Sequence, residues 1–305
     1  MSERSVKIYN DGSHFIGIRQ GAYPSHKKAT KVKPTDEEMV LADETKASSH
    51  HTTRKQLFET LYKKYYSSKL NNKKMQITED MLPYFDNTKQ AKEYVNKNCE
   101  RMYRNFVVRR VRLFRKVHLQ QWNYFATFTY DDNKHNEDSF RKRLMQCLQR
   151  FCCRKKWRYI GVWERGNNTD RLHFHAIMYI PEMVGELISK KDFDTKHKKM
   201  QTTLQNTFFN NKFGRTDFIP ITDKRHITED VMYMVKYMQK TGEKIIYSRG
   251  LPQYIISDVM DEDIICYLDE EERKIILFDK FGCWVDGCYI GRNTPEILEQ
   301  MPKGN

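Results

Sequence analysis

Two histidines stand two positions apart inside the apolar run RLHFHAIMYI, which covers residues 171–180. Side chains alternate along a strand, so His173 and His175 share one face while Leu172 and Phe174 lie on the other. Two imidazoles held close together cannot both carry a proton comfortably, and a shared cation removes that conflict. The pattern therefore indicates a metal site. The alternative is a pair of surface histidines on an edge strand.

A carboxylate from the preceding segment would complete such a site. RYIGVWERG and RLHFHAIMYI are separated by the short polar stretch NNTD, which favours a β-hairpin. A four-residue loop would place Glu164 directly across the hairpin from His173, with both side chains on the same side. Two nitrogens and one carboxylate oxygen would then converge on an open site that leaves room for water and a substrate phosphate.

A second set of chemical groups lies in the segment VMYMVKYMQK, residues 231–240. At 3.6 residues per turn, this segment has an apolar stripe and a roughly opposite Tyr-Lys face. The stripe consists of Val231, Met234, Val235 and Met238, and the opposite face consists of Tyr233, Lys236, Tyr237 and Lys240. A tyrosine, with its ordinary pKa of about 10, needs a metal that polarises the electrophile or a cation that stabilises phenolate. We therefore expect two tyrosine nucleophiles assisted by two lysines. The alternative is ordinary amphipathic tyrosines on a solvated face.

The elements that must position these groups are a mixture of strands and helices. NYFATFTYDD, after Trp122, is typical of a strand, and EDSFRKRLMQCLQRFCCRKKW is typical of an amphipathic helix. In that helix the spacing of Phe140, Leu144, Leu148 and Phe151 predicts a core stripe. A further helix is expected at roughly residues 194–210, followed by the strand RTDFIPIT. Thr228 is the expected N-cap of the Tyr-Lys helix.

The two ends of the chain show different patterns. VKIYNDGSHFIGIR predicts a hairpin around Asn10, Asp11 and Gly12, and helices are expected at RKQLFETLYKKYY and from about Asn87 to His118. The second helix is dense in arginine, which suits either a grip on phosphates or a solvated face. Strand-like runs and an acidic group follow residue 241. Strands joined partly by hairpins indicate an α+β fold rather than a doubly wound one.

The overall charge points to a polyanionic partner. The 305 residues include 54 Lys and Arg against 40 Asp and Glu, a net charge of +14. Nucleic acid is the usual partner of such a chain, and an anionic membrane surface is a less common one. No apolar run is long enough for a membrane helix and MSERSVKIYNDG lacks a signal region, so we expect a cytoplasmic protein. Seven unpatterned cysteines predict reduced thiols rather than disulfides.

Three segments together resemble the HUH superfamily of rolling-circle replication initiators, in particular its two-tyrosine branch in small single-stranded DNA phages and plasmids. They are the strand at 125–130, His173-Phe174-His175, and the helical Tyr233-x-x-Lys236-Tyr237. They occur in family order over about 115 residues. The N-terminal 95 residues fall outside the resemblance. No GxxxxGK[ST] loop is present, so helicase activity must come from elsewhere.

The resemblance implies a central antiparallel β-sheet flanked by helices, with Mg²⁺ or Mn²⁺ held by His173, His175 and Glu164. Asp170 is the second choice for the carboxylate. It also implies that a tyrosine attacks single-stranded DNA at an origin hairpin, forming a 5′-phosphotyrosine bond and releasing a 3′-hydroxyl. Host helicase and DNA polymerase would then act with the protein in the cytoplasm of a bacterial cell. No membrane partner is expected.

These observations divide the chain into three expected parts. Residues 1–95 form an N-terminal extension with a hairpin and helices, a candidate for DNA binding; residues 96–245 form the endonuclease domain; residues 246–305 form a β-rich acidic tail. A conjugative relaxase and a transposase are the rivals within the same superfamily. A relaxase usually places its tyrosine before the histidines, and a transposase is usually shorter. A non-catalytic DNA-binding protein with a structural metal is the rival from another class.

Overall fold

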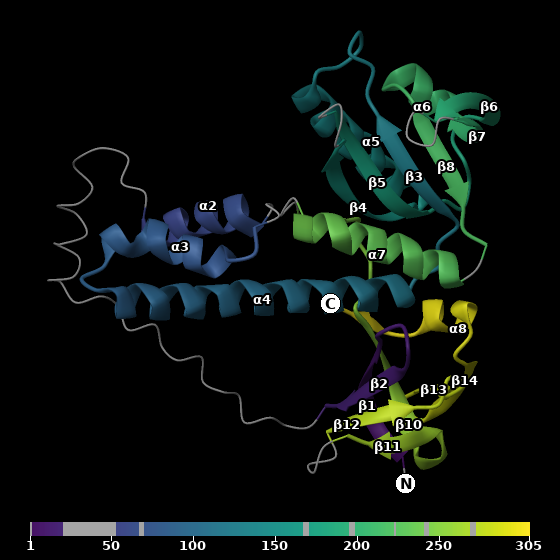
Figure 1. The fold of residues 1–305 in the computed structure, drawn as a ribbon. Coiled ribbons are helices and arrows are strands. Elements are labelled where there is room, and N and C mark those ends of the chain that lie inside the picture. Colours follow the sequence, from purple (N-terminus) through teal and green to yellow (C-terminus); the bar gives the residue numbers. More distant parts are fainter. Residues whose placement is uncertain are drawn as a thin grey trace, which may run out of the picture. The chain divides into compact units, whose positions relative to one another are not determined.

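The computed structural model describes residues 2–20, 53–66, 70–166, 171–194, 199–222, 224–240, 244–268 and 273–305. Its fold is α+β, as the sequence predicts, with antiparallel sheets, helices packed against them and a β-rich C-terminal region (Figure 1). The seven cysteines are all free, as expected. None of the helices in the described ranges is long and apolar enough to cross a membrane.

The helices and strands have the following bounds. The helices are α2 Arg54–Tyr66, α3 Lys73–Met81, α4 Thr88–His118, α5 Glu137–Lys155, α6 Thr207–Lys212, α7 Lys224–Lys240 and α8 Pro295–Gln300, with 3-10 turns η2 Leu82–Tyr84 and η3 Asp261–Asp263. The strands are β1 Ser2–Asn10, β2 Phe15–Arg19, β3 Tyr124–Thr129, β4 Arg158–Arg165, β5 Leu172–Tyr179, β6 Leu187–Asp194, β7 Lys199–Asn206, β8 Thr216–Pro220, β9 Ile246–Tyr247, β10 Tyr254–Met260, β11 Ile264–Tyr267, β12 Lys274–Leu277, β13 Gly282–Val285, β14 Cys288–Arg292 and β15 Lys303–Gly304.

A five-stranded antiparallel sheet with the order β8-β3-β5-β4-β9 carries the histidines. One of its faces forms an aromatic core, in which Phe128, Phe174 and Trp163 are buried. Removing a side chain of this size from water contributes about 1.5–3 kcal/mol, so this face anchors the sheet. Because side chains alternate, the same strands present His173 and His175 on the opposite face.

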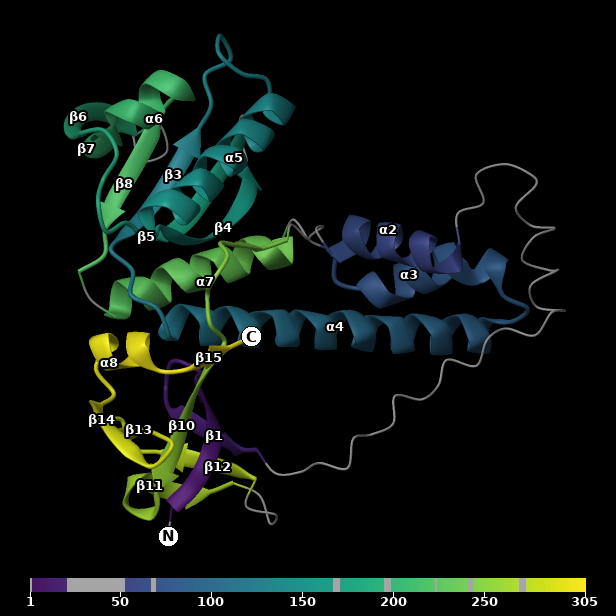
Figure 2. The same ribbon diagram turned by 180° about the vertical axis from the view of Figure 1, so that it is seen from behind.

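Helix α5 covers the aromatic face of this sheet, and Figures 1 and 2 show it from opposite sides. Phe140, Leu144 and Leu148 are fully buried, which confirms the predicted core stripe. The helix begins where the side chain of Asn136 accepts a hydrogen bond from the amide of Ser139, a standard N-cap. Its first turn is acidic and its last turn is basic, which complements the helix dipole.

Helix α7 packs against β4 and β5. Val231, Met234 and Val235 are buried and Lys236 is exposed, as the helical wheel predicts. The helix begins at Lys224, so the prediction of Thr228 as the N-cap was wrong by one helical turn. The polar residues before Thr228 are compatible with a helix, and the sequence holds no stronger stop at that point.

The β6–β7 pair corrects another expectation. Part of the segment predicted as a helix, residues 194–210, is the strand β7, which pairs with β6 as a two-stranded antiparallel ribbon, and only Thr207–Lys212 is helical. Lys, Gln, Met and Leu favour a helix when they are judged locally. Pairing with β6 overrides that preference, because strand propensity depends largely on context.

A second sheet joins the two ends of the chain. Its order is β11-β12-β2-β1-β10-β13-β14, with β15 also paired to β10. The predicted N-terminal hairpin forms as β1 and β2, and β1 pairs with β10 more than 240 residues away. An isolated hairpin is marginal in water, so these added strands provide the apolar partners it needs. Val6, Ile8, Ile255 and Phe281 are among the buried residues of this core.

The chain divides into two compact units. One contains residues 1–19 and 109–305, and the other contains residues 20–108. The second unit holds α2, α3 and the first part of α4, packed around Phe58, Ile77 and Val95. The division predicted from the sequence, 1–95, 96–245 and 246–305, follows chain order and stays a prediction for function. The observed pairing places the N-terminal hairpin with the C-terminal strands.

The arginine-rich helix α4 uses part of its charge inside the protein. Arg115 forms an ion pair with Asp11 at 2.7 Å, and Lys116 donates to the carbonyl oxygen of Leu251 at 2.9 Å. In the helical unit, Arg101 pairs with Glu59 at 3.3 Å. These basic residues therefore contribute to packing, a role that neither the phosphate-binding nor the solvated reading of the sequence included.

Candidate active site

The polar face of the five-stranded sheet places candidate residues in two neighbouring rows. One row runs from Glu164 through His173 to Thr129, and the next runs through His175 and Thr127 to Asp217. Directly paired residues in antiparallel strands lie on the same face, so all these side chains project together. The pairing of Glu164 with His173 is the register that the sequence predicts.

Two threonines on β3 orient the two imidazoles. The hydroxyl of Thr129 lies 2.8 Å from Nδ1 of His173, and the hydroxyl of Thr127 lies 3.0 Å from Nδ1 of His175. A hydrogen bond at one ring nitrogen fixes the tautomer and orientation of a histidine, a device common behind metal ligands. The sequence FATFT contains this signal, because its two threonines are spaced like the histidines opposite.

Glu164 is buried and leans diagonally across the hairpin. Its Oε2 lies 2.7 Å from Nε2 of His175, although its direct cross-strand neighbour is His173. The same oxygen accepts a hydrogen bond of 3.2 Å from the hydroxyl of Tyr233 on α7. One carboxylate oxygen therefore joins residues from two of the three sequence segments that were singled out for chemistry.

Tyr233 is seated against the histidine face by its ring as well. Its centroid lies 5.4 Å from that of His175 and 5.9 Å from that of Phe125, both in edge-to-face arrangements. The residue remains about one-third exposed, so a substrate can reach it. Lys236 is exposed one turn further along the helix. The side chains of Tyr237 and Lys240, and the whole of Asp170, lie outside the described residues.

These groups open into a pocket of about 920 Å³. Its lining includes the five residues Glu164, His173, His175, Thr127 and Tyr233, and it adds charged residues that the sequence analysis did not single out: Asp131, Arg171, Arg215 and Asp217. Their signal was the two-residue spacing of Arg171 with the histidines and of Arg215 with Asp217, which places each set on one strand face. Two guanidinium groups at one pocket suit a phosphate-containing ligand.

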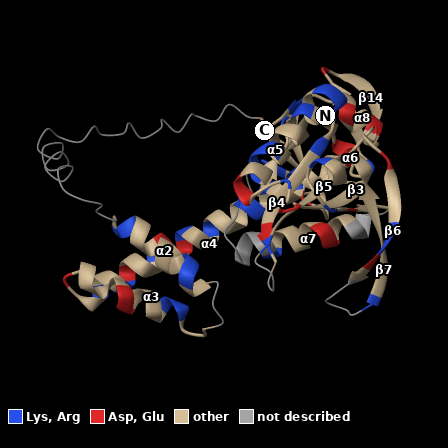
Figure 3. Cartoon of the chain, turned by 90° about the horizontal axis from the view of Figure 1, so that it is seen from above, with Lys and Arg blue, Asp and Glu red and all other residues tan. Residues whose placement is uncertain are grey.

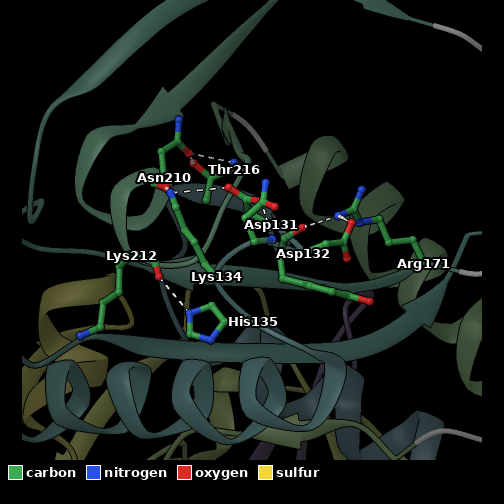
Figure 4. A network of polar contacts seen from close by, with 10 residues as sticks. Asp131, Asp132, Lys134, His135, Arg171, Asn210, Lys212 and Thr216 are labelled. Carbon is green, nitrogen blue, oxygen red and sulfur yellow. Dashed lines mark hydrogen bonds and ion pairs between the residues drawn. The ribbon is translucent and has the colours of Figure 1, made fainter.

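Polar contacts hold the rim of the pocket in place (Figure 4). Arg171 donates to the carboxylate of Asp132 at 2.6 Å and to the carbonyl of Tyr130 at 2.8 Å. Nearby, Lys134 bonds to the carbonyl of Asn210, and a ring nitrogen of His135 lies 3.0 Å from that of Lys212. The loop after β3 is thereby tied both to the start of β5 and to α6.

The electrostatics of the site favour a neutral imidazole. Burial, together with the neighbouring charge of His175, lowers the pKa of His173 to about 4, although Glu164 opposes that shift. A histidine with this pKa is neutral at pH 7 and offers a lone pair rather than a proton. Neutral imidazole is the form that binds metal ions.

The donor set fits a divalent cation in its chemistry. Adjacent ligands of an octahedral ion with bonds of 2.0–2.1 Å lie about 2.9 Å apart, close to the 2.7 Å between Glu164 and His175. The His173 and His175 ring centroids are 6.1 Å apart. In the described ranges no three His, Cys, Asp or Glu side chains are gathered closely enough to hold an ion. His173 would therefore have to approach the other two ligands on binding.

Comparison with known proteins identifies one segment. Residues 123–242 match a family model described as replication-associated protein ORF2. The matched segment, about two fifths of the chain, begins just before β3 and ends just after α7, so it contains the sheet, both histidines and both tyrosines. No curated protein and no solved structure matches the chain. The family match is consistent with a role in the initiation of replication.

Proposed function

We propose that this protein initiates rolling-circle replication by nicking and rejoining single-stranded DNA at an origin through a 5′-phosphotyrosine intermediate. The observation that carries the proposal is the position of Tyr233, whose hydroxyl bonds to Glu164 Oε2 while that oxygen contacts His175. The match of residues 123–242 to a replication-associated family supports the same reading. Two arginines at the pocket supply positive charge for the DNA backbone.

In this mechanism Tyr233 is the first nucleophile. Glu164 accepts the hydrogen bond that orients the hydroxyl, and Lys236 supplies a cation on the same helix. The hydroxyl gives up its proton, its oxygen bonds to phosphorus, and the bond from phosphorus to the 3′ oxygen breaks as that oxygen takes up a proton. The products are a 5′-phosphotyrosine and a free 3′-hydroxyl. The phosphodiester energy is conserved, so rejoining needs no ATP.

Glu164, His173 and His175 would hold Mg²⁺ or Mn²⁺, which supplies polarisation of the scissile phosphate when bound. The remaining work belongs to the chain: Thr127 and Thr129 keep the imidazoles oriented, and Arg171 and Arg215 attract the DNA backbone. Tyr237, one helical turn beyond Tyr233, would act in the second cleavage, assisted by Lys240. Alternation of two tyrosines lets one chain close a circle after a round of copying.

The proposed cellular setting follows from this chemistry. The partners would be an origin hairpin in single-stranded DNA together with the helicase and DNA polymerase of a bacterial host, in whose cytoplasm the protein would work. The released 3′-hydroxyl is the primer that such a polymerase extends.

The test is covalent capture of DNA. Purified protein is incubated with labelled single-stranded oligonucleotides from the replicon that encodes it, with Mn²⁺ or with EDTA, and run on a denaturing gel. We expect a protease-sensitive, Mn²⁺-dependent shifted band that the Tyr233→Phe/Tyr237→Phe double variant lacks. Tyr289→Phe is the matched control, because Tyr289 is an exposed tyrosine in β14. It should form the adduct normally.

The single variants assign the order of attack. Tyr233→Phe should abolish the first cleavage, whereas Tyr237→Phe should still form the first adduct and fail in strand transfer. Reversible, metal-independent binding with no adduct in any condition would replace this proposal with a non-catalytic DNA-binding protein.

A further inference from the structure

The β6–β7 ribbon ends in a pair of exposed apolar side chains. Phe193 and Met200 are cross-strand partners and therefore share one face of the ribbon. They are 55% and 61% exposed, respectively. Exposed apolar pairs at a ribbon tip are costly in water and promote strand addition, so they indicate a surface that meets a partner.

The base of the ribbon is fixed by buried polar contacts. Asn206, fully buried, receives a hydrogen bond from Phe209 and donates its own amide to Thr216 of β8. Asp192 accepts from Thr203 and Gln205 and pairs with Arg215 at 3.0 Å. Because Arg215 and Thr216 line the candidate active-site pocket, the ribbon is rooted in the wall of that pocket.

Positive charge surrounds the apolar pair. Lys190, Lys191 and Lys199 are exposed on the two strands, and Lys191 lies on the same face as Phe193. In Figure 3 the ends of the ribbon carry blue Lys and Arg segments. The carboxylate of Asp192, on the same strand as Phe193, is engaged by Arg215. The tip therefore presents cations beside apolar groups.

We propose that the tip of the β6–β7 ribbon is a subsite for single-stranded DNA next to the active-site pocket. A base stacks on Phe193 and packs against Met200, while Lys190, Lys191 and Lys199 contact the backbone phosphates on either side. This inference rests on the proposed function for the existence of a DNA substrate, but it assigns a binding site that the matched chemistry does not require.

Single-stranded DNA fits this surface better than the other occupants. An unpaired base offers an open ring face to an aromatic side chain, whereas bases within a duplex already stack on each other. A second copy of the chain would bring the same lysines together, and like charges would oppose that contact. Alternating cations and an apolar pair match a strand whose phosphates and bases alternate in the same way.

The test measures binding apart from cleavage. Fluorescence anisotropy of a labelled, mixed-sequence single-stranded oligonucleotide is recorded in EDTA with the wild type, Phe193→Ala and Met200→Ala. Stacking of one base implies a loss of about 5- to 100-fold in affinity for Phe193→Ala. The matched control is Phe278→Ala, which removes a half-exposed phenylalanine outside the five-stranded sheet and should leave affinity unchanged.

A second measurement addresses the phosphates. The slope of log affinity against log salt should become shallower by about 0.7 for each lysine contact removed, in Lys191→Ala and Lys199→Ala. The ribbon subsite is overturned by an unchanged single-strand affinity of Phe193→Ala, by a loss confined to duplex DNA, or by conversion of a wild-type dimer to a monomer.

The covalent-capture assay separates this idea from the proposed function. A wild type that forms adducts while Phe193→Ala binds normally would remove the ribbon subsite and leave the enzyme. A wild type that forms no adduct while Phe193→Ala binds weakly would remove the enzyme and leave the subsite. Rescue of affinity by Phe193→Trp, which restores a stacking surface, would support stacking over a general effect on the fold.

Discussion

Two sheets of this protein bury carboxylates to nearly the same extent but use them differently. Glu164 in the five-stranded sheet is 7% exposed, and Asp258 and Asp263 in the larger sheet are 6% and 7% exposed. Asp258 accepts the backbone amides of Ser5 and Gly287 at 2.8 and 2.9 Å. Glu164 instead meets the side chains of His175 and Tyr233.

The partners, rather than the burial, separate a structural carboxylate from a candidate catalytic one. Ser5 and Gly287 have positive φ angles of 54° and 78°, so Asp258 stabilises a bulge in β1 and the turn between β13 and β14. Backbone amides are fixed donors that leave such a carboxylate little freedom. Side-chain partners can rearrange around a ligand, which leaves Glu164 able to take part in binding and reaction.

A matched pair of isosteric variants should show the largest contrast. Glu164→Gln should reduce nicking on the order of 100-fold or more, because it removes a charged metal ligand and an acceptor for Tyr233. Asp258→Asn should leave nicking unchanged but lower the free energy of unfolding by about 2 kcal/mol, because one backbone amide loses its acceptor. Gel-based nicking rates and urea denaturation measure the two effects.

The converse result would break the comparison. If Asp258→Asn impaired nicking in protein shown to be folded, the larger sheet would have to contribute to the reaction. If Glu164→Gln lowered stability and left nicking unchanged, the polar face of the five-stranded sheet would be structural.

Variants of the two threonines should show a smaller effect at the same face. Thr127→Val and Thr129→Val keep the side-chain shape but remove the hydroxyl beside each Nδ1, which should weaken metal affinity about 10- to 100-fold. The readout is the Mn²⁺ concentration that gives half-maximal nicking. Thr294→Val, which alters the N-cap of α8, is the control and should leave that concentration unchanged. Equal Mn²⁺ requirements in all variants would argue against a metal at these histidines.

Local alternation explains why much of the site could be predicted from sequence. The shared face of His173 and His175 and the hairpin register of Glu164 depend on residues within about a dozen positions. The contact of Glu164 with His175 rather than His173 depends on side-chain rotamers, which no sequence pattern encodes. The helical face of Tyr233 was equally local, but its contact with Glu164 required the packing of α7 on β4.

Non-local pairing explains what the sequence did not reveal. Nothing in residues 2–10 indicates that they pair with Tyr254–Met260, because the partner strand lies at the other end of the chain. The ribbon was misread as a helix for the same reason, since its strands are specified by each other and by buried Asn206. Arg215 became a candidate only when β8 was placed beside β3, at the edge of the pocket.

The smallest predicted effect concerns the pH dependence of the larger sheet. Burial raises the pKa of Asp263, while the amide of Gly282 and the charge of Arg292 partly oppose that shift. The folded protein therefore binds this proton more tightly than the unfolded chain does, and the associated stability declines as pH rises from the ordinary value of 3.8 through the raised value. Asp263→Asn removes this titration.

Urea unfolding of the wild type and Asp263→Asn across this pH range isolates the effect as a difference between the two proteins. The wild type should lose stability relative to the variant as pH rises, and the difference should level off above the folded pKa. A difference that moved the opposite way would mean that Asp263 is held as a carboxylate by its donors, like Asp258. Both buried aspartates of that sheet would then be fixed anions, and the contrast with Glu164 would become sharper.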